Sequence, residues 1–283
     1  ATFELLGVHK LRQATRGSLA IPLIGRESEH QTLIQWADQL MARQPVALGI
    51  SGEAGIGKSR LFYAVQQHME SQLPLRTYRA YAVSYTQHAS LSLLRQILRQ
   101  LLQVNENDTL EQVTLVLKGH LRLLPGFEEL QQSLLLQLLY PEREDRVLSY
   151  QSADVLQKQW YQVLADFVLK MAQAQPLLLI LEDLQWADQT SLDWLAYFLE
   201  QLSTLKDTQL LLGATWREGD SGLEALGWNQ HLRLPPLSPE ACLTLFCHHL
   251  NVPQTLPGQF QALQPLAERL VERSRGNPYY LEE

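Results

Sequence analysis

Cysteine is scarce in this chain of 283 residues, which contains only Cys242 and Cys247. Two thiols cannot build a disulfide framework, and no second ligand pair lies at zinc-finger spacing, so we expect two buried thiols on a helix rather than a metal site. Long apolar runs are also missing, because the stretch from Leu177 to Leu181 is far too short to span a membrane. The N-terminus lacks the layout of a signal peptide, and its start at Ala1 indicates an excised fragment.

An excess of basic residues is absent as well. The chain carries 23 Lys and Arg against 30 Asp and Glu, a formal net charge of −7. No basic stripe stands out, so we expect no direct contact with nucleic acid. A hydrophobic content of 46% with 19% charged residues is that of an ordinary globular protein, and the length favours about two domains.

The most informative stretch that is present reads GEAGIGKS, from Gly52 to Ser59. It fits G-x-x-x-x-G-K-[ST], the P-loop, and it lies between a strand-like run and a helix-like run, as that motif requires. Glycines let the backbone aim N–H groups at phosphates, and the helix N-terminus favours an anion. We therefore expect ATP or ADP to be bound by Gly52, Glu53, Ala54, Gly55, Ile56, Gly57, Lys58, Ser59 and Arg60.

Two side chains of this loop have expected chemical roles. Lys58 would place a mobile positive charge near the β- and γ-phosphates. The hydroxyl of Ser59 would ligate Mg²⁺, which prefers hard oxygen ligands. Sparse cysteine together with a P-loop favours a reducing, cytoplasmic setting.

A second element is the apolar run from Leu177 that ends in two acids, Glu182 and Asp183. In open α/β sheets ligands bind beyond the carboxyl ends of strands, where acids can hold Mg²⁺ and polarise an attacking water. Downstream of a P-loop, this pattern is typical of a Walker B element. By position Glu182 takes the place of the acid on the Mg²⁺ side, and Asp183 takes the place of the acid that activates water. This element more often begins with Asp than with Glu. Their division of labour, and the hydrolysis rate, therefore stay open.

The alternation of strands and helices predicts an α/β fold: a P-loop NTPase with a mostly parallel sheet flanked by helices. We expect strands at residues 45–51, 75–83, 177–181, 209–215 and 231–234, and helices at 28–43, 60–70, within 91–140, and at 153–173 and 190–202. Ser238 is expected to cap a further helix that opens with Pro239. We divide the chain into a linker or tail at 1–20, the nucleotide-binding domain at 21–235 and a truncated helical lid at 236–283.

Four further stretches strengthen this interpretation: residues 22–29, reading PLIGRESE; 182–188, reading EDLQWAD; 212–217, reading LGATWR; and 276–278, reading GNP. In this order they resemble the hhGRExE element, the extended Walker B, the sensor strand and the GxP motif of the STAND branch of AAA+-like ATPases. The resemblance covers roughly residues 21–283. No stretch resembles the lid arginine that many AAA+ motors use.

The resemblance implies roles for several residues. Ile24, Gly25 and Arg26 would lie near the adenine, Arg217 would sense the γ-phosphate, and Pro278 would pack on the base. Each has a plainer alternative: Arg26 pairs with Glu27 or Glu29 on the surface, Arg217 is a solvated loop arginine, and Gly276 and Asn277 form an ordinary helix C-cap. Trp186 is expected to be a packing residue. Asp188 is expected either to orient the Walker B loop or to cap the helix that starts near Thr190, and capping is favoured.

The function expected from these motifs is a regulatory ATPase module of a multidomain signalling protein. It would switch between ADP and ATP states with Mg²⁺-dependent hydrolysis, and its partners would be the nucleotide, other domains of the parent chain (a cyclase, kinase, DNA-binding or repeat domain) and a second copy in the ATP state. We expect no membrane partner. Two alternatives remain: an interaction scaffold that binds nucleotide without turnover, and a P-loop kinase acting on a small substrate.

Overall fold

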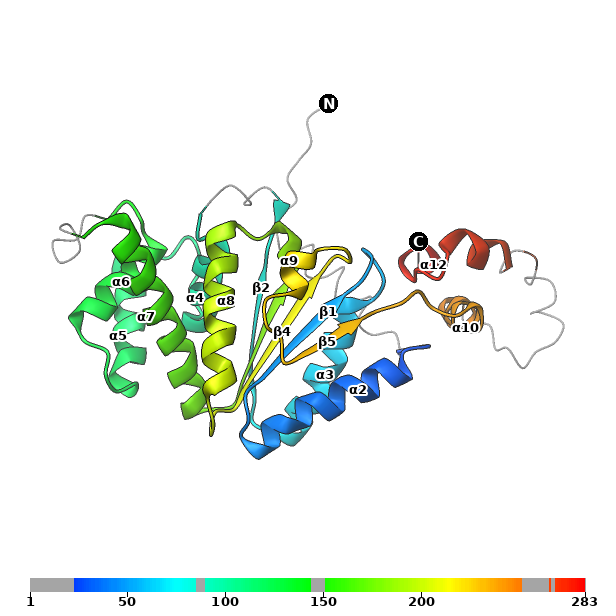
Figure 1. The fold of residues 1–283 in the computed structure, drawn as a ribbon, viewed down its shortest axis with the longest axis horizontal. Helices are drawn as coiled ribbons and strands as arrows, with labels where there is room; N and C mark the ends of the chain where they lie inside the picture. Colours follow the sequence, from blue (N-terminus) through cyan, green and yellow to red (C-terminus); the bar gives the residue numbers. More distant parts are fainter. Residues whose placement is uncertain (1–22, 85–89, 144–150, 251–264, 266–267, 283) are drawn as a thin grey trace, which may run out of the picture.

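The computed structural model describes residues 23–84, 90–143, 151–250, 265 and 268–282, so the predicted linker at 1–20 lies outside the described residues. Five parallel strands form one sheet in the order β2-β3-β4-β1-β5 (Figure 1). The strands are β1 Val46–Ser51, β2 Arg76–Tyr81, β3 Leu177–Glu182, β4 Leu210–Trp216 and β5 Gln230–Arg233. The predicted α/β fold with a parallel sheet is confirmed, and each predicted strand overlaps an observed one.

The helices alternate with the strands. They are α2 Glu27–Ala37, α3 Lys58–Gln72, α4 Ser92–Leu102, α5 Leu110–Leu123, α6 Glu129–Leu139, α7 Ala153–Ala174, α8 Gln189–Thr204, α9 Ser221–Glu224, α10 Pro239–His249 and α12 Tyr279–Glu282, with 3-10 turns η1 Asp38–Ala42 and η3 Leu184–Trp186. The helix predicted over 28–43 is α-helical only to Ala37 and continues as η1. The cap of α10 is as predicted, because the Ser238 hydroxyl accepts a hydrogen bond from the Ala241 backbone N–H at 3.2 Å.

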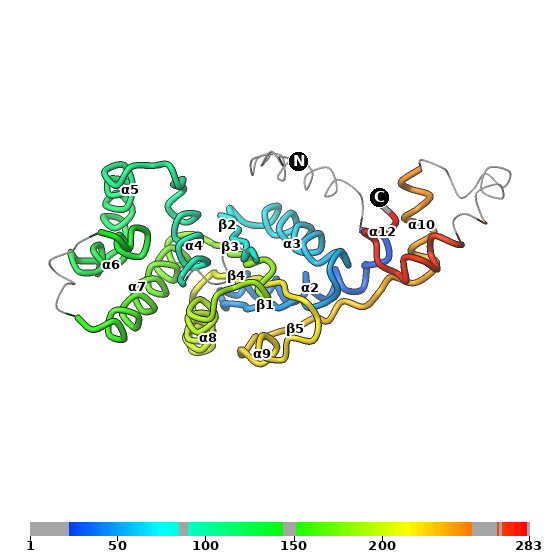
Figure 2. The backbone as a smooth tube through the Cα atoms, turned by 90° about the horizontal axis from the view of Figure 1, so that it is seen from above, coloured from blue at the N-terminus to red at the C-terminus, as the bar shows by residue number. Residues whose placement is uncertain are grey.

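Successive residues of each central strand face opposite layers. On β3, Leu178 and Ile180 pack with α2 and α3, whereas Leu177, Leu179 and Leu181 pack with α4, α7 and α8. Figure 2 shows α3 on one side of the strands and α8 on the other. Strands buried on both faces read as continuous apolar runs, which is why the sequence pattern identified them.

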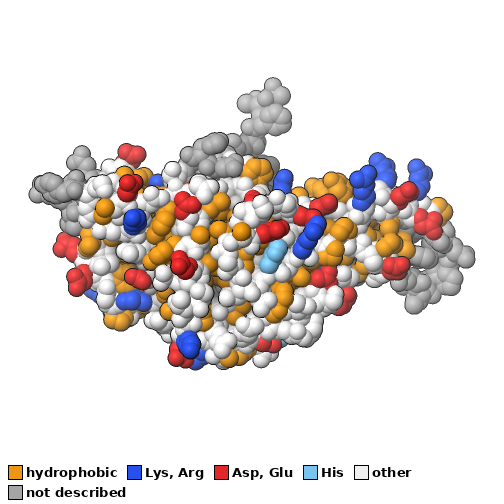
Figure 3. Space-filling model, viewed as in Figure 1, with side chains coloured by type: hydrophobic (Ala, Val, Ile, Leu, Met, Phe, Trp, Pro, Cys, Tyr) orange, Lys and Arg blue, Asp and Glu red, His pale blue; other side chains and the backbone are white. Residues whose placement is uncertain are grey.

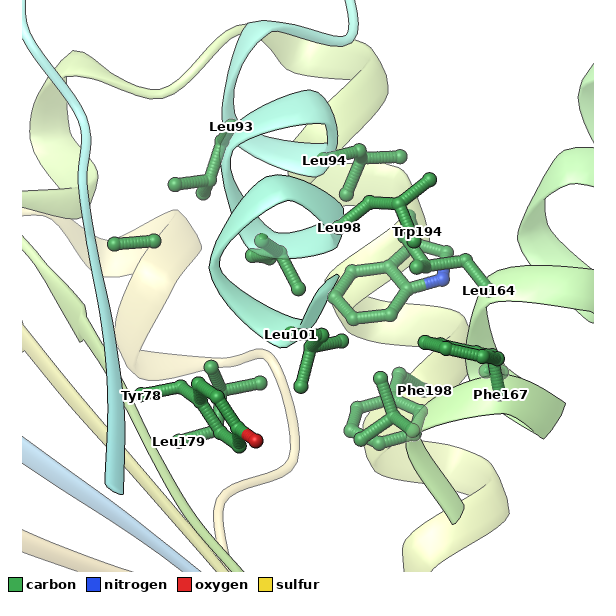
Figure 4. Packing of buried hydrophobic residues seen from close by; sticks show 14 of the residues in the cluster. Tyr78, Leu93, Leu94, Leu98, Leu101, Leu164, Phe167, Leu179, Trp194 and Phe198 are labelled. Carbon is green, nitrogen blue, oxygen red and sulfur yellow. The ribbon is translucent and has the colours of Figure 1, made fainter. Parts of the chain in front are cut away.

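The larger apolar layer is built from helices that follow β2. Figure 4 shows Leu98 of α4, Phe167 of α7 and Trp194 and Phe198 of α8 turned toward one another beside the sheet. The rings of Trp194 and Phe198 are stacked with centroids 4.9 Å apart, and both residues are buried. This packing anchors β2 and β3, and the carboxyl end of β3 carries part of the site described below.

The C-terminal helices form a small cluster of their own. Leu237, Cys242, Leu245 and Leu281 are buried together, with Ile24 packed against them. In Figure 1 these helices lie at the end of the sheet opposite to α5 and α6. Cys242 and Cys247 are buried free thiols on α10, as predicted, and among the described residues no cluster of three or more His, Cys, Asp or Glu is arranged to hold a metal.

No helix in the described part of the chain combines the length and apolarity needed to cross a membrane. On the face drawn in Figure 3, acidic and basic side chains of the described residues are interspersed, without a continuous basic stripe.

Candidate functional site

A cavity of about 390 Å³ lies where the loops after β1, β3 and β4 meet the C-terminal helices. That volume is typical of a small-molecule site. It is lined by Leu23, Ile24, Arg26, Ala54, Gly55, Ile56, Gly57, Lys58, Ser59, Arg60, Asp183, Gln185, Trp186, Arg217, Leu237, Leu245, Pro278 and Tyr279. Most of the residues predicted for the site are therefore brought together here. Gly25, Gly52, Glu53 and Glu182 adjoin the lining residues without lining the cavity themselves.

The loop between β1 and α3 has the backbone of an anion cradle. Gly57 takes a left-handed conformation (φ 106°) and is the N-cap of α3, so it offers no side-chain acceptor to the first-turn amides. Those amides and the positive end of the helix dipole face the cavity and favour a phosphate. The residues present thus fit the predicted nucleotide.

Lys58 is the first residue of α3, and its side chain is folded back over the loop. Its Nζ donates to the carbonyl oxygens of Gly52 at 3.0 Å and Glu53 at 2.8 Å. Burial lowers the pKa of Lys58 below its ordinary value; Asp183 opposes that shift and Arg217 adds to it. A buried ammonium interacts strongly with a phosphate, because little solvent screens it.

Glu182, the last residue of β3, is almost fully buried, at 4% exposed. One carboxylate oxygen accepts a hydrogen bond from the Ser59 hydroxyl, and the other accepts from the guanidinium of Arg79. A serine hydroxyl beside a carboxylate is the oxygen donor set that Mg²⁺ prefers, so the chain's residues fit this ion. Arg79 was missed in the sequence, although the alternation of β2 placed it on the face opposite to Tyr78 and Ala80.

Asp183 follows at a left-handed backbone position with φ 60°. Its backbone N–H donates to the Thr215 hydroxyl at 3.1 Å, and its exposed carboxylate accepts from the Gln185 amide at 3.2 Å. Asp183 lines the cavity, whereas Glu182 is buried behind the lining residues beside Ser59. The two acids therefore occupy different environments.

Arg217 comes directly after β4 and lies over the ring of Trp186, with its guanidinium carbon 5.3 Å from the ring centroid. The Gln185 side-chain oxygen accepts from its backbone N–H at 3.1 Å. Arg217 is exposed, as its plainer alternative required, and it also lines the cavity. Trp186, predicted to be a packing residue, is half-buried and supports this arginine by a cation–π contact.

Arg26 is not on the surface, and that part of its alternative interpretation is wrong. The residue is 5% exposed, and it pairs with Glu29 at 3.0 Å while donating to the Ile56 carbonyl at 3.3 Å. Burial lowers the pKa of Arg26, and Glu29 opposes the shift. The preceding Gly25 (φ 69°) lies against α10, where an added Cβ would come within 2.3 Å of the Ala241 Cβ.

The segment Gly276–Asn277–Pro278 closes the cavity from the C-terminal side. Pro278 lines it, and the Asn277 amide donates to the carbonyl of Ala54 in the P-loop at 2.8 Å. Gly276 has φ 81° after a helical stretch, which also fits the predicted C-cap. The Asn277 contact was missed because nothing local in the sequence signals a partner 223 positions away.

Asp188 is buried and caps α8 as predicted, accepting from the Ser191 N–H at 3.0 Å. It also accepts from the backbone N–H groups of Leu91 at 2.9 Å and Ser92 at 3.1 Å, where α4 begins. One carboxylate thus joins the loop after β3 to the start of α4.

A family model described as the AAA ATPase domain matches residues 22–212. The chain belongs to this family. The AAA+-like part of the resemblance seen in the sequence is confirmed. The match extends over residues 22–212 without assigning roles to single residues, so the roles predicted for the site residues stay predictions. No curated protein matches the chain.

Solved structures show the same AAA+ fold. The Orc1 protein of Aeropyrum pernix in complex with DNA is similar with a TM-score of 0.52 and 14% identity, over 93% of this chain and 59% of that one. The HORMA:CdnC:Trip13 complex of E. coli MS115-1 contains a chain with a TM-score of 0.51 and 10% identity, over 95% of this chain and 78% of that one.

A STAND protein with a tetratricopeptide repeat sensor from Pyrococcus horikoshii is similar with a TM-score of 0.44 and 14% identity, over 90% of this chain and 28% of that one. This AAA ATPase domain thus spans about three fifths of the Orc1 chain and under a third of the STAND protein.

Proposed function

We propose that this AAA ATPase domain is the regulatory ATPase module of a cytoplasmic multidomain signalling protein of the STAND branch, and that it switches between ADP- and ATP-bound states. The observation that carries the proposal is the convergence on one cavity of the P-loop, the acids after β3 and the Pro278 segment. The four ordered motifs in the sequence support the STAND assignment and a division into residues 21–235 and a lid from 236.

The proposed roles follow the surroundings of each group. Residues 52–60 bind the phosphates, and Ile24, Gly25, Arg26 and Pro278 surround the base. Ser59 and Glu182 hold Mg²⁺, with Asp183 beside them, and the bound ion supplies charge neutralisation on the phosphate oxygens. The exposed carboxylate of Asp183 is placed to orient and deprotonate a water, and Arg217 is placed to contact a γ-phosphate.

The switch depends on contacts between the lid and the nucleotide site. Asn277 and Gly25 both join the C-terminal helices to the nucleotide-binding part, and Pro278 lies where the base is expected. A ligand shifts a conformational equilibrium only by its differential affinity for the two states, so a lid that contacts the base and a γ-phosphate sensor on β4 can report which nucleotide is bound. Other domains of the parent chain, and a second copy in the ATP state, are the proposed receivers of that signal.

Binding of ADP and ATP by the purified chain, measured by calorimetry, tests the site. Lys58→Ala should weaken both affinities by about a hundredfold, because a charge-assisted contact to the phosphates is lost. Lys206→Ala, at an exposed lysine between α8 and β4, is the matched control and should bind like the unmodified chain. Unchanged affinity in Lys58→Ala would refute the assignment.

Turnover separates the proposal from its two alternatives. Phosphate release from ATP with Mg²⁺ should be measurable in the full-length protein and should be lost in Asp183→Asn. Binding without release favours the nucleotide-binding scaffold, and transfer to a small acceptor favours the kinase.

A further inference from the structure

Arg79 is a charged residue in the interior of β2, and its guanidinium contacts Glu182. The side chains are 20% and 6% exposed, respectively. A carboxylate buried this deeply needs a cation or several hydrogen bonds, since removing it from water alone is costly. Arg79 supplies that cation at the position where the Mg²⁺-side acid of the site stands.

The register of the sheet places Arg79 next to Glu182. In the parallel pair β2–β3, Arg79 lies opposite Ile180 and Tyr81 lies opposite Glu182, so Arg79 and Glu182 are diagonal neighbours on the face covered by α3. The second guanidinium nitrogen donates to the Gln66 side chain of α3 at 3.0 Å. Arginine presents its donors in a rigid planar fork, and two acceptors on different elements therefore hold this fork in one orientation.

Glu182 divides its carboxylate between two partners. One oxygen accepts from Arg79 and the other from the hydroxyl of Ser59 in the P-loop. A metal held by Ser59 and Glu182 thus shares the carboxylate with a fixed positive charge. The extra methylene of Glu, compared with the Asp more usual at this position, lets the carboxylate reach both partners.

We propose that Arg79 is a resident cationic group of the nucleotide site, which competes with Mg²⁺ for Glu182 and so makes nucleotide affinity depend only weakly on Mg²⁺. This rests on the proposed function, in that it takes the cavity to be the nucleotide site. Arg79 acts by two routes: its charge repels the metal, and it also attracts the phosphates when no metal is bound. Arg79 is a positioning residue, because its contacts are to Glu182 and Gln66 rather than to the cavity.

The test compares ADP affinity in excess Mg²⁺ with ADP affinity in EDTA, measured by calorimetry on the purified chain. The ratio of interest is the ADP affinity in Mg²⁺ divided by the ADP affinity in EDTA, and it should be small in the unmodified chain. Arg79→Gln should raise the ratio about tenfold, the effect of removing one partly screened unit charge. Arg76→Gln, at an exposed arginine at the start of the same strand, should leave the ratio unchanged. A merely structural role would change both affinities alike and leave the ratio constant.

A second variant keeps the test decisive if Arg79→Gln fails to fold. Glu182→Asp keeps the charge but withdraws the carboxylate from Arg79, so it should raise the ratio in the same direction. A ratio that stays constant or falls in the folded variants overturns the role of Arg79. Absence of ADP binding by the unmodified chain in both buffers would instead overturn the proposed function.

Discussion

At the scale of single residues, Asp188 is expected to contribute strongly to stability. Its buried carboxylate accepts from backbone N–H groups at the starts of α4 and α8. Asp188→Ala leaves these donors without their partner, so the free energy of unfolding should fall by about 2–4 kcal/mol. Urea denaturation followed by circular dichroism measures the change.

The matched control is Asp193→Ala, at an exposed aspartate on α8. Asp193 accepts a hydrogen bond from the Gln189 side chain at the exposed surface, so the change should stay within about 0.5 kcal/mol. Equal losses in the two variants would show that Asp188 does not cap both helices.

Residue roles that depend on local spacing were predictable from the sequence, and those that depend on pairing were not. The P-loop residues and the acids after β3 follow from motif patterns, and the cavity gathers them. Arg79 and Asn277 were missed because their partners lie 103 and 223 positions away along the chain. Only the register of β2 with β3, and the docking of the C-terminal helices, bring these atoms together.

At the scale of elements, the packing of α10 against the turn at Gly25 can be tested by substitution. Gly25→Ala forces a Cβ into the Ala241 Cβ and strains a left-handed backbone, so α10 must shift. We expect ADP affinity to fall about tenfold or more, because the lid would no longer close over the base.

Gly219→Ala is the control for the strain alone. Gly219 is also left-handed, with φ 91°, but an added Cβ there would meet no atom within 4 Å. This variant should lose stability without losing ADP affinity. Similar losses of affinity in both variants would mean that the contact with α10 is irrelevant to binding.

The elements of the sheet could be predicted more securely than the helices between β2 and β3. Buried parallel strands are continuous apolar runs, and those runs were visible in the sequence. The leucine-rich region 91–140 showed helical spacing throughout, but it is divided into α4, α5 and α6. The first break is at Gln103, which ends α4 with φ 56°, and nothing about a glutamine signals that conformation. The capping box at Thr109, which starts α5, is a local pattern that sequence reasoning could have used.

At the scale of the whole molecule, nucleotide should stabilise the sheet and the lid together, because the cavity is lined by both. A ligand at a hundred times its Kd stabilises by about 2.7 kcal/mol, which corresponds to a rise in Tm of about 5–10 °C for a chain of this size. Thermal denaturation with increasing ADP measures the rise. The Lys58→Ala variant, with its Kd raised about a hundredfold, should be stabilised by only about 0.4 kcal/mol at the same ADP concentration, a rise in Tm of about 1–2 °C. An equal rise in that variant would place the stabilising site elsewhere.

The capping of both α4 and α8 by Asp188 also has a consequence for the order of folding during synthesis. The amide of Leu91, at the start of α4, is bound by a carboxylate 97 positions later in the chain. During synthesis, α4 emerges well before the residue that caps it, by roughly 5–20 s at ordinary ribosomal rates. Through that interval the N–H groups that Asp188 later binds depend on water for hydrogen bonds. The start of α4 can therefore reach its final hydrogen bonding only after β3 and the loop behind it have been made.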